Sequence, residues 1–403
     1  MRQLAILLIS FSLISCAAVD KLGESTSSLI SSITGGDDNA EPPNELMEYD
    51  AELELEILWK ESVGDGYDDK HVNLVAAIDG GLIFAAARKG LVLAFNTLDG
   101  DEIWKVDTKA TLSAGPGIGS NTVIIGTNNA EVLALDKITG EALWSAKVSS
   151  EVLSVPVIEQ GIVIVRTADG KTIALDETNG HALWEYSQNI PALSIRGSGA
   201  PLILNNQVIA GYANGKLIAL QLKNGKYDWE TSIAIPKGRS EVERLVDIVV
   251  SPIEVDGNIY IASYQGGVSV VSAIDGDILW RQEDVSSYSG LSADWGYIYL
   301  SDDSSDVWQL EQSSGAAMWK QIDLHQRQLS GTLSYEDYVV VGDFEGYVHW
   351  LSNEDGRQLA RIRIAKDAIE AQPLIADNII YIYASDGTLA AVKVKELVRE
   401  PEE

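Results

Sequence analysis

A glycine followed four residues later by a tryptophan recurs along most of this chain, and no other sequence feature constrains the fold as strongly. The copies are Gly100 and Trp104, Gly140 and Trp144, Gly180 and Trp184, Gly225 and Trp229, Gly276 and Trp280, and Gly315 and Trp319. A seventh copy has Gly356 but Ala360 in the tryptophan position, and Trp59 precedes the series without such a glycine. Because the copies lie about 40 to 50 residues apart, the length of one four-stranded propeller blade, they predict a β-propeller.

Two further sets of recurring residues, one of prolines and one of glycines, also predict short strands joined by tight turns. Prolines followed seven residues later by Val or Ile are Pro116, Pro156, Pro201, Pro252 and Pro373. Glycines recur where a hairpin needs a positive φ, at Gly90, Gly170, Gly215, Gly266, Gly346 and Gly387. Between these markers lie short apolar segments such as 91–95 without a helical period. We therefore expect an all-β, eight-bladed propeller of four-stranded antiparallel blades over residues 51–397.

The position of Trp59 predicts how the ring closes. It lacks a preceding glycine because the strands that would come before it are absent upstream, whereas three strands without an outer partner are expected within residues 373–394. The last blade is therefore predicted to take its outer strand from about residues 54–60. Such closure removes an exposed sheet edge.

The N-terminus has the layout of a secretory signal. Arg2 precedes an apolar run over residues 4–14 that is too short to cross a membrane as a mature helix. The run ends in Leu13-Ile14-Ser15-Cys16, which resembles the lipobox of bacterial lipoproteins, although a chance cysteine is the alternative. The resemblance implies a signal peptide over residues 1–15, lipid such as palmitate on Cys16, and, with no Asp after it, the periplasmic face of the outer membrane.

Two segments are expected to lie outside the folded domain. Residues 16–50 are rich in Ser, Gly, Asp, Asn, Pro and Glu, and beyond the lipidated cysteine they are predicted to form a flexible tether. Residues 398–403 are predicted to be a charged tail.

Composition excludes several classes of function. The chain has 60 acidic and 29 basic side chains, a net charge of -31, so that a surface suited to nucleic acid is not expected. The single cysteine excludes an intramolecular disulfide, a cysteine zinc site and a CxxC redox centre. With 46% hydrophobic residues the chain can still bury a core.

No pattern for catalysis, a cofactor or a structural metal stands out. The histidines, His71, His181, His325 and His349, lie in different repeats and form no zinc motif, so they are interpreted as structural or surface residues. The glycine-rich segment 115–119 precedes a strand rather than a helix. Acidic runs at 65–69 and 302–306 lack the glycine and closing glutamate of a calcium loop, and solvated turns are favoured over calcium binding. We expect a protein that is not an enzyme.

The copy at 134–144, Ala-Leu-Asp-Lys-Ile-Thr-Gly-Glu-Ala-Leu-Trp, resembles the quinoprotein-type repeat. That resemblance implies that the tryptophan lies on the outermost strand and packs between blades. The structural positions are Trp59, Trp104, Trp144, Trp184, Trp229, Trp280 and Trp319. Quinoprotein dehydrogenases share the repeat, but their cofactor site uses a vicinal disulfide that a chain with one cysteine cannot form, so this activity is the less favoured reading.

The interval between repeats varies in an informative way. From the repeat tryptophan to the next register proline it is 12 residues after Trp104 and after Trp144, but 17 after Trp184 and 23 after Trp229. Both longer connections join an outer strand to the next inner strand in consecutive blades, so we expect them side by side on one face. Loops on a rigid scaffold are where binding residues gather.

Both long connections combine arginines with apolar residues on an otherwise acidic chain, as an interface core with charges at its rim does. The first contains Leu193, Ile195 and Arg196, and the second contains Arg244 and Asp247. In the alternative, Leu193, Ile195, Leu245 and Val246 fold back as a lid over the propeller mouth.

The lipobox, the tether, the repeats, the Leu-x-Ile-Arg-Gly segment at 193–197 and the stretch 341–350, Val-Gly-Asp-Phe-Glu-Gly-Tyr-Val-His-Trp, together resemble the BamB family of lipoproteins. Members are subunits of the outer-membrane β-barrel assembly machinery. The resemblance implies a scaffold that docks on the periplasmic POTRA domains of BamA and meets the other subunits indirectly. It maps docking residues onto Leu193, Ile195, Arg196 and Asp247, with Val249 at a position that is acidic in the family. The alternative function is a chaperone that captures nascent outer-membrane proteins by adding their strands to its outer edges.

Overall fold

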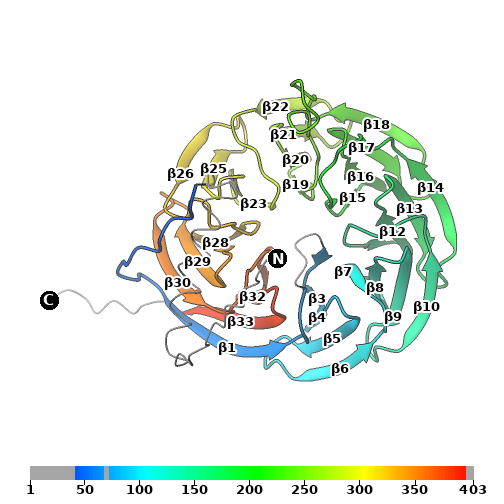
Figure 1. Cartoon of the computed structure of the whole chain (residues 1–403), viewed down its shortest axis with the longest axis horizontal. Helices are drawn as coiled ribbons and strands as arrows, with labels where there is room; N and C mark the ends of the chain where they lie inside the picture. Colours follow the sequence, from blue (N-terminus) through cyan, green and yellow to red (C-terminus); the bar gives the residue numbers. More distant parts are fainter. Residues whose placement is uncertain (1–40, 68–71, 396–403) are drawn as a thin grey trace, which may run out of the picture. The chain divides into compact units, whose positions relative to one another are not determined.

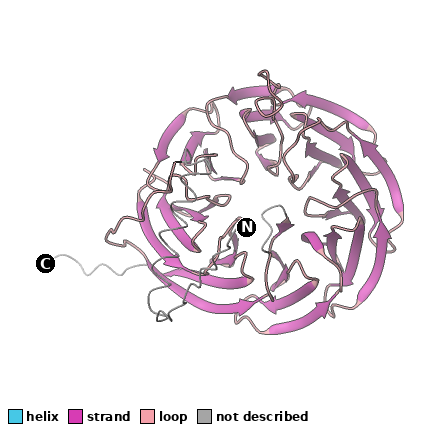
Figure 2. Cartoon of the chain, viewed as in Figure 1, coloured by secondary structure: helices cyan, strands magenta, loops and turns pink. Residues whose placement is uncertain are grey.

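The computed structural model describes residues 41–67 and 72–395, and all regular structure in these ranges is β-strand (Figure 2). One compact unit begins at Pro43. The predicted signal peptide, Cys16, the tether up to residue 40, His71 and the charged tail lie outside the described residues. Residues 41–67 and 72–395 include no helix long and apolar enough to cross a membrane.

Within the described ranges the strands form eight sheets, arranged around a ring as the blades of a propeller (Figure 1). In blades 1 to 7 the strands follow chain order from the axis to the rim, and blade 1 is the first complete one. Blades 1 and 2 consist of β3 (Ala77–Asp79), β4 (Leu82–Ala86), β5 (Leu91–Asn96) and β6 (Glu102–Asp107), then β7 (Leu112–Ile118), β8 (Thr122–Thr127), β9 (Glu131–Asp136) and β10 (Ala142–Lys147). Blades 3 and 4 consist of β11 (Val157–Glu159), β12 (Ile162–Arg166), β13 (Lys171–Asp176) and β14 (Ala182–Ser187), then β15 (Leu202–Leu204), β16 (Gln207–Gly211), β17 (Lys216–Gln221) and β18 (Tyr227–Ser232).

The second half of the ring repeats this arrangement. Blades 5 and 6 consist of β19 (Ile253–Val255), β20 (Asn258–Ser263), β21 (Gly267–Ser272) and β22 (Ile278–Gln282), then β23 (Leu291–Ala293), β24 (Tyr297–Ser301), β25 (Val307–Glu311) and β26 (Ala317–Gln321). Blades 7 and 8 consist of β27 (Leu333–Tyr335), β28 (Tyr338–Gly342), β29 (Tyr347–Ser352) and β30 (Gln358–Arg363), then β31 (Leu374–Ala376), β32 (Ile379–Tyr383), β33 (Thr388–Lys395) and β1 (Glu54–Ser62). The predicted eight-bladed propeller is confirmed.

Two details depart from the expected pattern. Blade 2 has a fifth strand, because β2 (Asn73–Leu74) pairs in parallel with β7 at its inner edge. In blade 5 the positive φ values of the second hairpin belong to Gln265 and to Gly267, the first residue of β21, and not to Gly266.

The ring closes as predicted. Strand β1 pairs antiparallel with β33 along its whole length, from Glu54 opposite Lys395 to Ser62 opposite Thr388, and forms the outer strand of blade 8 (Figure 1). Because β33 and β1 come from opposite ends of the chain, no hairpin turn joins them. Blade 8 therefore offers no turn glycine on which a tryptophan from blade 7 could pack, which explains Ala360 in that position.

A β-bulge in every outer strand aims the repeat tryptophan inward. The pairing skips one residue in each outer strand, the residue directly before the tryptophan, as at Leu143 between Ala142 and Trp144, or before Ala360 in β30. A bulge adds a residue without a partner and turns its neighbours. The skipped residue therefore faces outward at the rim, whereas the tryptophan faces the neighbouring blade.

The tryptophans join consecutive blades. Six of them donate a hydrogen bond of 2.7 to 3.0 Å from Nε1 to a backbone oxygen of the next blade. Donor and acceptor residues are Trp59 and Thr97, Trp104 and Lys137, Trp144 and Glu177, Trp184 and Leu222, Trp280 and Gln312, and Trp319 and Asn353. The Nε1 of Trp229 is buried without a partner among the described residues. The structural role predicted for these residues fits this geometry.

The turn glycine of each following blade lies directly against the indole. A Cβ atom on the seven glycines of this register would come within 2.4 to 2.8 Å of the tryptophan ring, and their φ angles are 65° to 77°. Both the space and the backbone conformation therefore require glycine. Tryptophan and glycine recur together because seven of the eight blade junctions are built from both, and the junction between blades 7 and 8 has neither.

The segment before β1, residues 43–53, lies along blades 6 and 7, and we call it the strap. Asn44 N donates to His325 O at 3.0 Å, and Glu52 N donates to Leu359 O at 2.7 Å. Leu46 packs against the buried apolar cluster that includes Leu324 and Leu329. The sequence placed residues up to 50 in the tether, but from Pro43 onward the chain is held against the propeller by these contacts.

The stretch 341–350 supports the strap. Within it, Asp343 is fully buried and binds Arg327 at 2.8 Å and His349 Nε2 at 3.0 Å, and Arg327 Nη1 donates to Asn44 O at 2.9 Å. Although burial acts to raise it, hydrogen bonds from His349 and the charge of Arg327 hold the pKa of Asp343 below its usual value. Burial lowers the pKa of His349, which keeps the imidazole neutral. This motif is thus part of the fold.

Candidate functional site

The two long connections emerge on one face of the propeller. The first, residues 188–201, joins β14 to β15, and the second, residues 233–252, joins β18 to β19. In an antiparallel blade, connections to the next blade lie at the same end as the turn between the second and third strands. We call this end the long-loop face, and the opposite end, with the first and third turns of each blade, the turn face.

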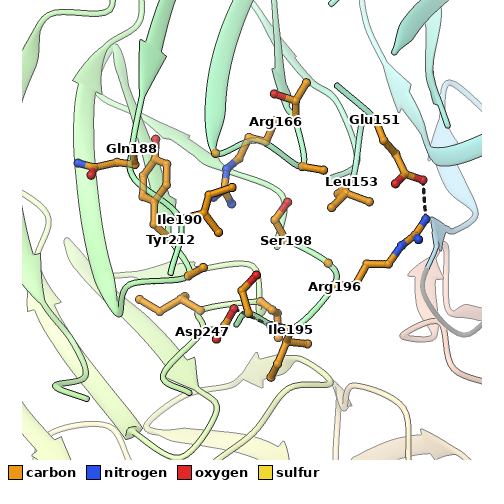
Figure 3. A pocket seen from close by; sticks show the side chains of 18 of the residues that line it. Glu151, Leu153, Arg166, Gln188, Ile190, Ile195, Arg196, Ser198, Tyr212 and Asp247 are labelled. Carbon is orange, nitrogen blue, oxygen red and sulfur yellow. Dashed lines mark hydrogen bonds and ion pairs between the residues drawn. The ribbon is translucent and has the colours of Figure 1, made fainter. Parts of the chain in front are cut away.

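The two loops are bonded to each other, as their predicted position side by side requires. Ile195 N donates to Asp247 Oδ1 at 2.9 Å, and Ala200 N donates to Ser251 Oγ at 2.9 Å. Residues of both loops line a pocket of about 280 Å³, where Asp247 lies beside Ile195 (Figure 3). The structure thus brings together Ile195, Arg196 and Asp247, three of the residues expected at the site.

Asp247 is a carboxylate in an environment that disfavours its charge. Its exposed fraction is 1%, and Oδ2 is buried without a hydrogen-bond partner among the described residues. Burial raises the pKa of Asp247 to about 6, although the hydrogen bond from Ile195 N acts in the other direction. A buried, half-satisfied carboxylate lowers stability, and such groups concentrate at functional sites.

The first loop presents its other residues outward. Leu193 is 41% exposed. Arg196 pairs with Glu151 at 2.6 Å, from the short connection between blades 2 and 3, at one edge of the pocket (Figure 3). The arginine side chain keeps 41% of its surface exposed, so its guanidinium can meet a partner at little cost in stability.

The backbone at residues 195–198 separates two hollows. It lines the first pocket and also a second cavity of about 400 Å³, with Leu245, Val249, Tyr264 and Tyr288 on the other side. Val249, where the resemblance led us to expect an acid, therefore adds apolar surface to both hollows. The segment forms a ridge with a depression on either side, a shape that a protein partner can clasp.

Not every expected residue takes part. Arg244 is exposed in the turn at 241–244 and lines neither hollow. Val246 is buried beneath the second loop, as the lid alternative required, whereas Leu193 is exposed and Ile195 and Leu245 are half-buried. Of these four residues only Val246 is buried, and it packs beside the turn of blade 4 at Gly215, so a lid over the propeller mouth stays a prediction.

Sequence reasoning missed the floor of the pocket. Arg166 ends β12 and is almost fully buried; its Nη1 donates to Gly199 O at 3.1 Å and its guanidinium lies 4.7 Å from the ring centre of Tyr212. Burial lowers the pKa of Arg166, and its Nε is buried without a hydrogen-bond partner among the described residues. The signal was an arginine closing the apolar run Ile162 to Val165.

Other candidate chemistry has a structural explanation. Asp306 of the acidic run at 302–306 pairs with Lys320 at 2.6 Å and with His325 at 2.8 Å. Among residues 41–67 and 72–395, no group of three or more His, Cys, Asp or Glu is arranged to hold a metal ion. The acidic run at 65–69 lies partly outside these ranges.

Comparison with known proteins identifies the family. The family model described as outer membrane protein assembly factor BamB matches residues 88–321 and 314–400. The outer membrane protein assembly factor BamB of Pseudomonas aeruginosa is 45% identical over 354 residues, covering 88% of this chain and 93% of that protein. The BamB protein of Escherichia coli is 34% identical over 344 residues, covering 83% and 88%.

Solved structures agree with this relationship. The crystal structure of BamB from Moraxella catarrhalis superposes with a TM-score of 0.77 at 27% identity, covering 84% of this chain and 99% of that one. A quinohemoprotein alcohol dehydrogenase from Comamonas testosteroni gives 0.65 at 14% identity, covering 87% and 78%, and at that identity it shows the propeller fold alone. The chain therefore belongs to the BamB family of outer membrane protein assembly factors.

Proposed function

We propose that this chain is a non-enzymatic scaffold subunit of the outer-membrane β-barrel assembly machinery, and that the ridge at 195–198, together with the adjacent Leu193, docks on the periplasmic POTRA domains of BamA. Leu193 and Ile195 supply the apolar contact, while Arg196 and Asp247 fix its orientation. Other subunits of the machinery are met indirectly. Arg244 is exposed in the second loop and is the outermost of the proposed docking residues.

The hydrogen bond between Ile195 N and Asp247 Oδ1 carries this proposal, because it fixes the ridge in one position against the second loop. A pre-organised loop loses less conformational entropy on binding. The exposed Leu193 and half-exposed Arg196 then stand in the arrangement typical of interface anchors, an apolar contact beside a charged rim.

The same proposal covers location. Cys16 and the preceding apolar run favour a lipid anchor that holds the propeller at the periplasmic face of the outer membrane. Exchanging residues 1–16 for a signal peptide that is cleaved without lipid attachment is expected to release the protein into the soluble periplasmic fraction, as cell fractionation would measure. Retention in the outer membrane of cells that lack BamA would point to an anchor other than Cys16.

The docking proposal is tested by Arg196→Glu in the full-length protein. The reversed charge faces Glu151 and the partner, so BamA is expected to be lost when the variant is purified from membranes. Because the arginine is half-exposed, its melting temperature should be unchanged. Lys89→Glu is the matched control, since Lys89 pairs with Asp65 at 2.8 Å on the same face of blade 1. Equal recovery of BamA with both variants would show that the docking site is elsewhere.

One observation favours a second candidate function, the capture of unfolded barrel strands at the rim. The bulge residue before the repeat tryptophan is apolar in most blades, and six such residues are 37% to 54% exposed. They are Leu58, Ile103, Leu143, Leu183, Leu279 and Met318. The seventh, Leu359, is only 5% exposed and lies where the strap bonds to the edge of β30. The strap thus shows how an extended segment can bond to an outer strand and shield its apolar bulge residue from solvent.

The two candidate functions predict different crosslinks: unfolded barrel proteins at the rim, or BamA at the long loops. A photoreactive residue at position 143 or 183 is expected to crosslink unfolded barrel proteins if the rim captures strands, and one at position 193 is expected to crosslink BamA. Replacing Leu143 and Leu183 together with Ser should then weaken client crosslinking and leave BamA recovery unchanged. Ile274→Ser, an exposed apolar residue away from the rim, is the control.

A further inference from the structure

The strongest unexplained surface feature lies on the turn face, away from the long loops. Trp295 stands in the first turn of blade 6, between β23 and β24, and its side chain is completely exposed to solvent. An isolated indole without any packing is unusual, because tryptophan buries a large area wherever it can, and exposed tryptophans are enriched at binding sites.

The other blades provide an internal control for this position. In the same turn they carry Gly80 and Gly81, Ser120 and Asn121, Gln160 and Gly161, Asn205 and Asn206, Asp256 and Gly257, Glu336 and Asp337, and Asp377 and Asn378. Apart from Gln160 and Glu336, these are residue types that tight turns prefer. The turn geometry therefore does not call for tryptophan, and the fold gains nothing from an indole in water.

The turn that carries Trp295 is held firmly. Tyr299 donates its hydroxyl to Asp294 Oδ2 at 2.7 Å, and Gln312 Nε2 donates to Asp294 O at 2.6 Å. The backbone of Gln312 also donates to Gly296 O at 2.8 Å. These bonds hold the backbone of the turn in place, so a partner would meet Trp295 on a rigid support.

Trp295 borders a groove between blades 6 and 7 of about 600 Å³. The aromatic and apolar side is formed by Trp295, Tyr297, Met318 and Trp319, and the carboxylate side by Asp294, Glu336, Asp337, Glu354 and Asp355. None of the described residues that line this groove is Lys or Arg. The nearby Arg357 is paired with Asp355 at 3.0 Å and with Glu52 at 3.1 Å.

We propose that this groove is a second protein-binding surface, and that it receives a basic segment of a partner. The aliphatic stem of a Lys or Arg fits along Trp295 and Met318, its cation meets the indole face, and its charged end meets the carboxylates of Glu336 and Asp337. This goes beyond docking at the long loops, because the groove lies on the other face of the ring.

Charge decides between possible occupants. An apolar segment would cover these carboxylates without pairing them, which costs free energy. An anionic lipid surface would be repelled by a chain with a net charge of -31. Of these occupants, only a basic segment can both pair with the carboxylates and pack its aliphatic stems on the aromatic side of the groove.

The test uses the full-length protein and a short probe, the acetylated hexapeptide Ala-Lys-Ala-Arg-Ala-Lys, in a calorimetric titration. Trp295→Ala and the double variant Glu336→Gln and Asp337→Asn are each expected to weaken binding at least tenfold, without a change in melting temperature. Raising the salt concentration should also weaken it. A glutamate version of the peptide is expected not to bind.

General attraction to an acidic protein is controlled by Asp99→Asn with Asp101→Asn, which removes two exposed charges from the same face of blade 1. Ile274→Ala controls for the loss of an exposed apolar side chain. The proposal is wrong if the wild-type protein does not bind the peptide, if Trp295→Ala binds it equally well, or if the blade 1 variant weakens binding as much. Dimers that Trp295→Ala abolishes would show that a second copy of the chain is the occupant instead.

Discussion

The blade junctions and the two long loops use similar residues in opposite ways. At a junction, a repeated tryptophan is packed on a glycine and in six cases donates its Nε1 hydrogen to the next blade. In the loops, positions without a counterpart in the other blades either keep exposed surface, as Leu193 does, or hold a buried carboxylate with one unbonded oxygen, as Asp247 does. This difference indicates that the repeated tryptophans and glycines close the ring, whereas the residues of the two long loops are available for binding.

The largest effect is expected at a junction. Trp104→Ala removes a buried indole between blades 1 and 2 and its 3.0 Å hydrogen bond to Lys137 O. We expect the free energy of unfolding to fall by about 3–5 kcal/mol, the usual cost of truncating a buried aromatic residue. Urea denaturation measures this. A loss below about 1 kcal/mol would mean that the junction does not hold the ring together.

The buried charges beneath the strap are expected to cost slightly less. Asp343→Asn removes the carboxylate that faces Arg327 and His349, leaving Arg327 with Glu345 at the surface. We expect a loss of about 2–4 kcal/mol in the free energy of unfolding. Asp355→Asn, in an exposed pair with Arg357, is the control and should cost less than about 1 kcal/mol. Similar losses for both variants would contradict the structural role of Asp343.

Removing the charge of Asp247 is expected to raise the free energy of unfolding, whereas the two substitutions above lower it. Its pKa of about 6 lies above the ordinary value of 3.8, so the folded state binds the proton more tightly and the stability contributed by this group falls as pH rises from about 4 to 6. Asp247→Asn is therefore expected to raise the free energy of unfolding at pH 7.5 by about 1–3 kcal/mol. Denaturation at pH 4.5 and 7.5 measures the slope, and a variant less stable than wild type at pH 7.5 would refute the prediction.

The smallest effect distinguishes one junction from the others. Trp184→Phe breaks the 2.8 Å hydrogen bond to Leu222 O, whereas Trp229→Phe removes a buried Nε1 hydrogen that has no acceptor. The first substitution should therefore cost about 1 kcal/mol more than the second. Thermal unfolding of the two variants side by side measures the difference, and equal losses would show that these hydrogen bonds contribute little to the ring.

Much of the fold was predictable because its signals repeat. Trp59 without a glycine was enough to place β1 in the last blade, since a propeller must close. Ala360 was visible as an exception but not explicable, because its cause is the missing turn between strands from opposite chain ends. The strap was not predictable in detail. Asn44 and Glu52 bond through backbone atoms, which composition does not reveal.

The site was predictable only in part. The lengths of the two loops placed them on one face, and Ile195 and Asp247 do meet there. Arg166 and Tyr212 escaped notice because they belong to regular strands or short turns and reach the pocket from its floor. Arg244 looked equivalent to Arg196 by composition, but the turn at 241–244 carries it away from both hollows.

The most direct test of the central claim is the affinity of BamA for Leu193→Ser, measured together with the melting temperature of that variant. Leu193 belongs to no blade and is 41% exposed. If the residues that interrupt the repeat carry binding, affinity falls at least tenfold at an unchanged melting temperature. An unchanged affinity, or a loss explained by unfolding, would contradict the separation of ring and site.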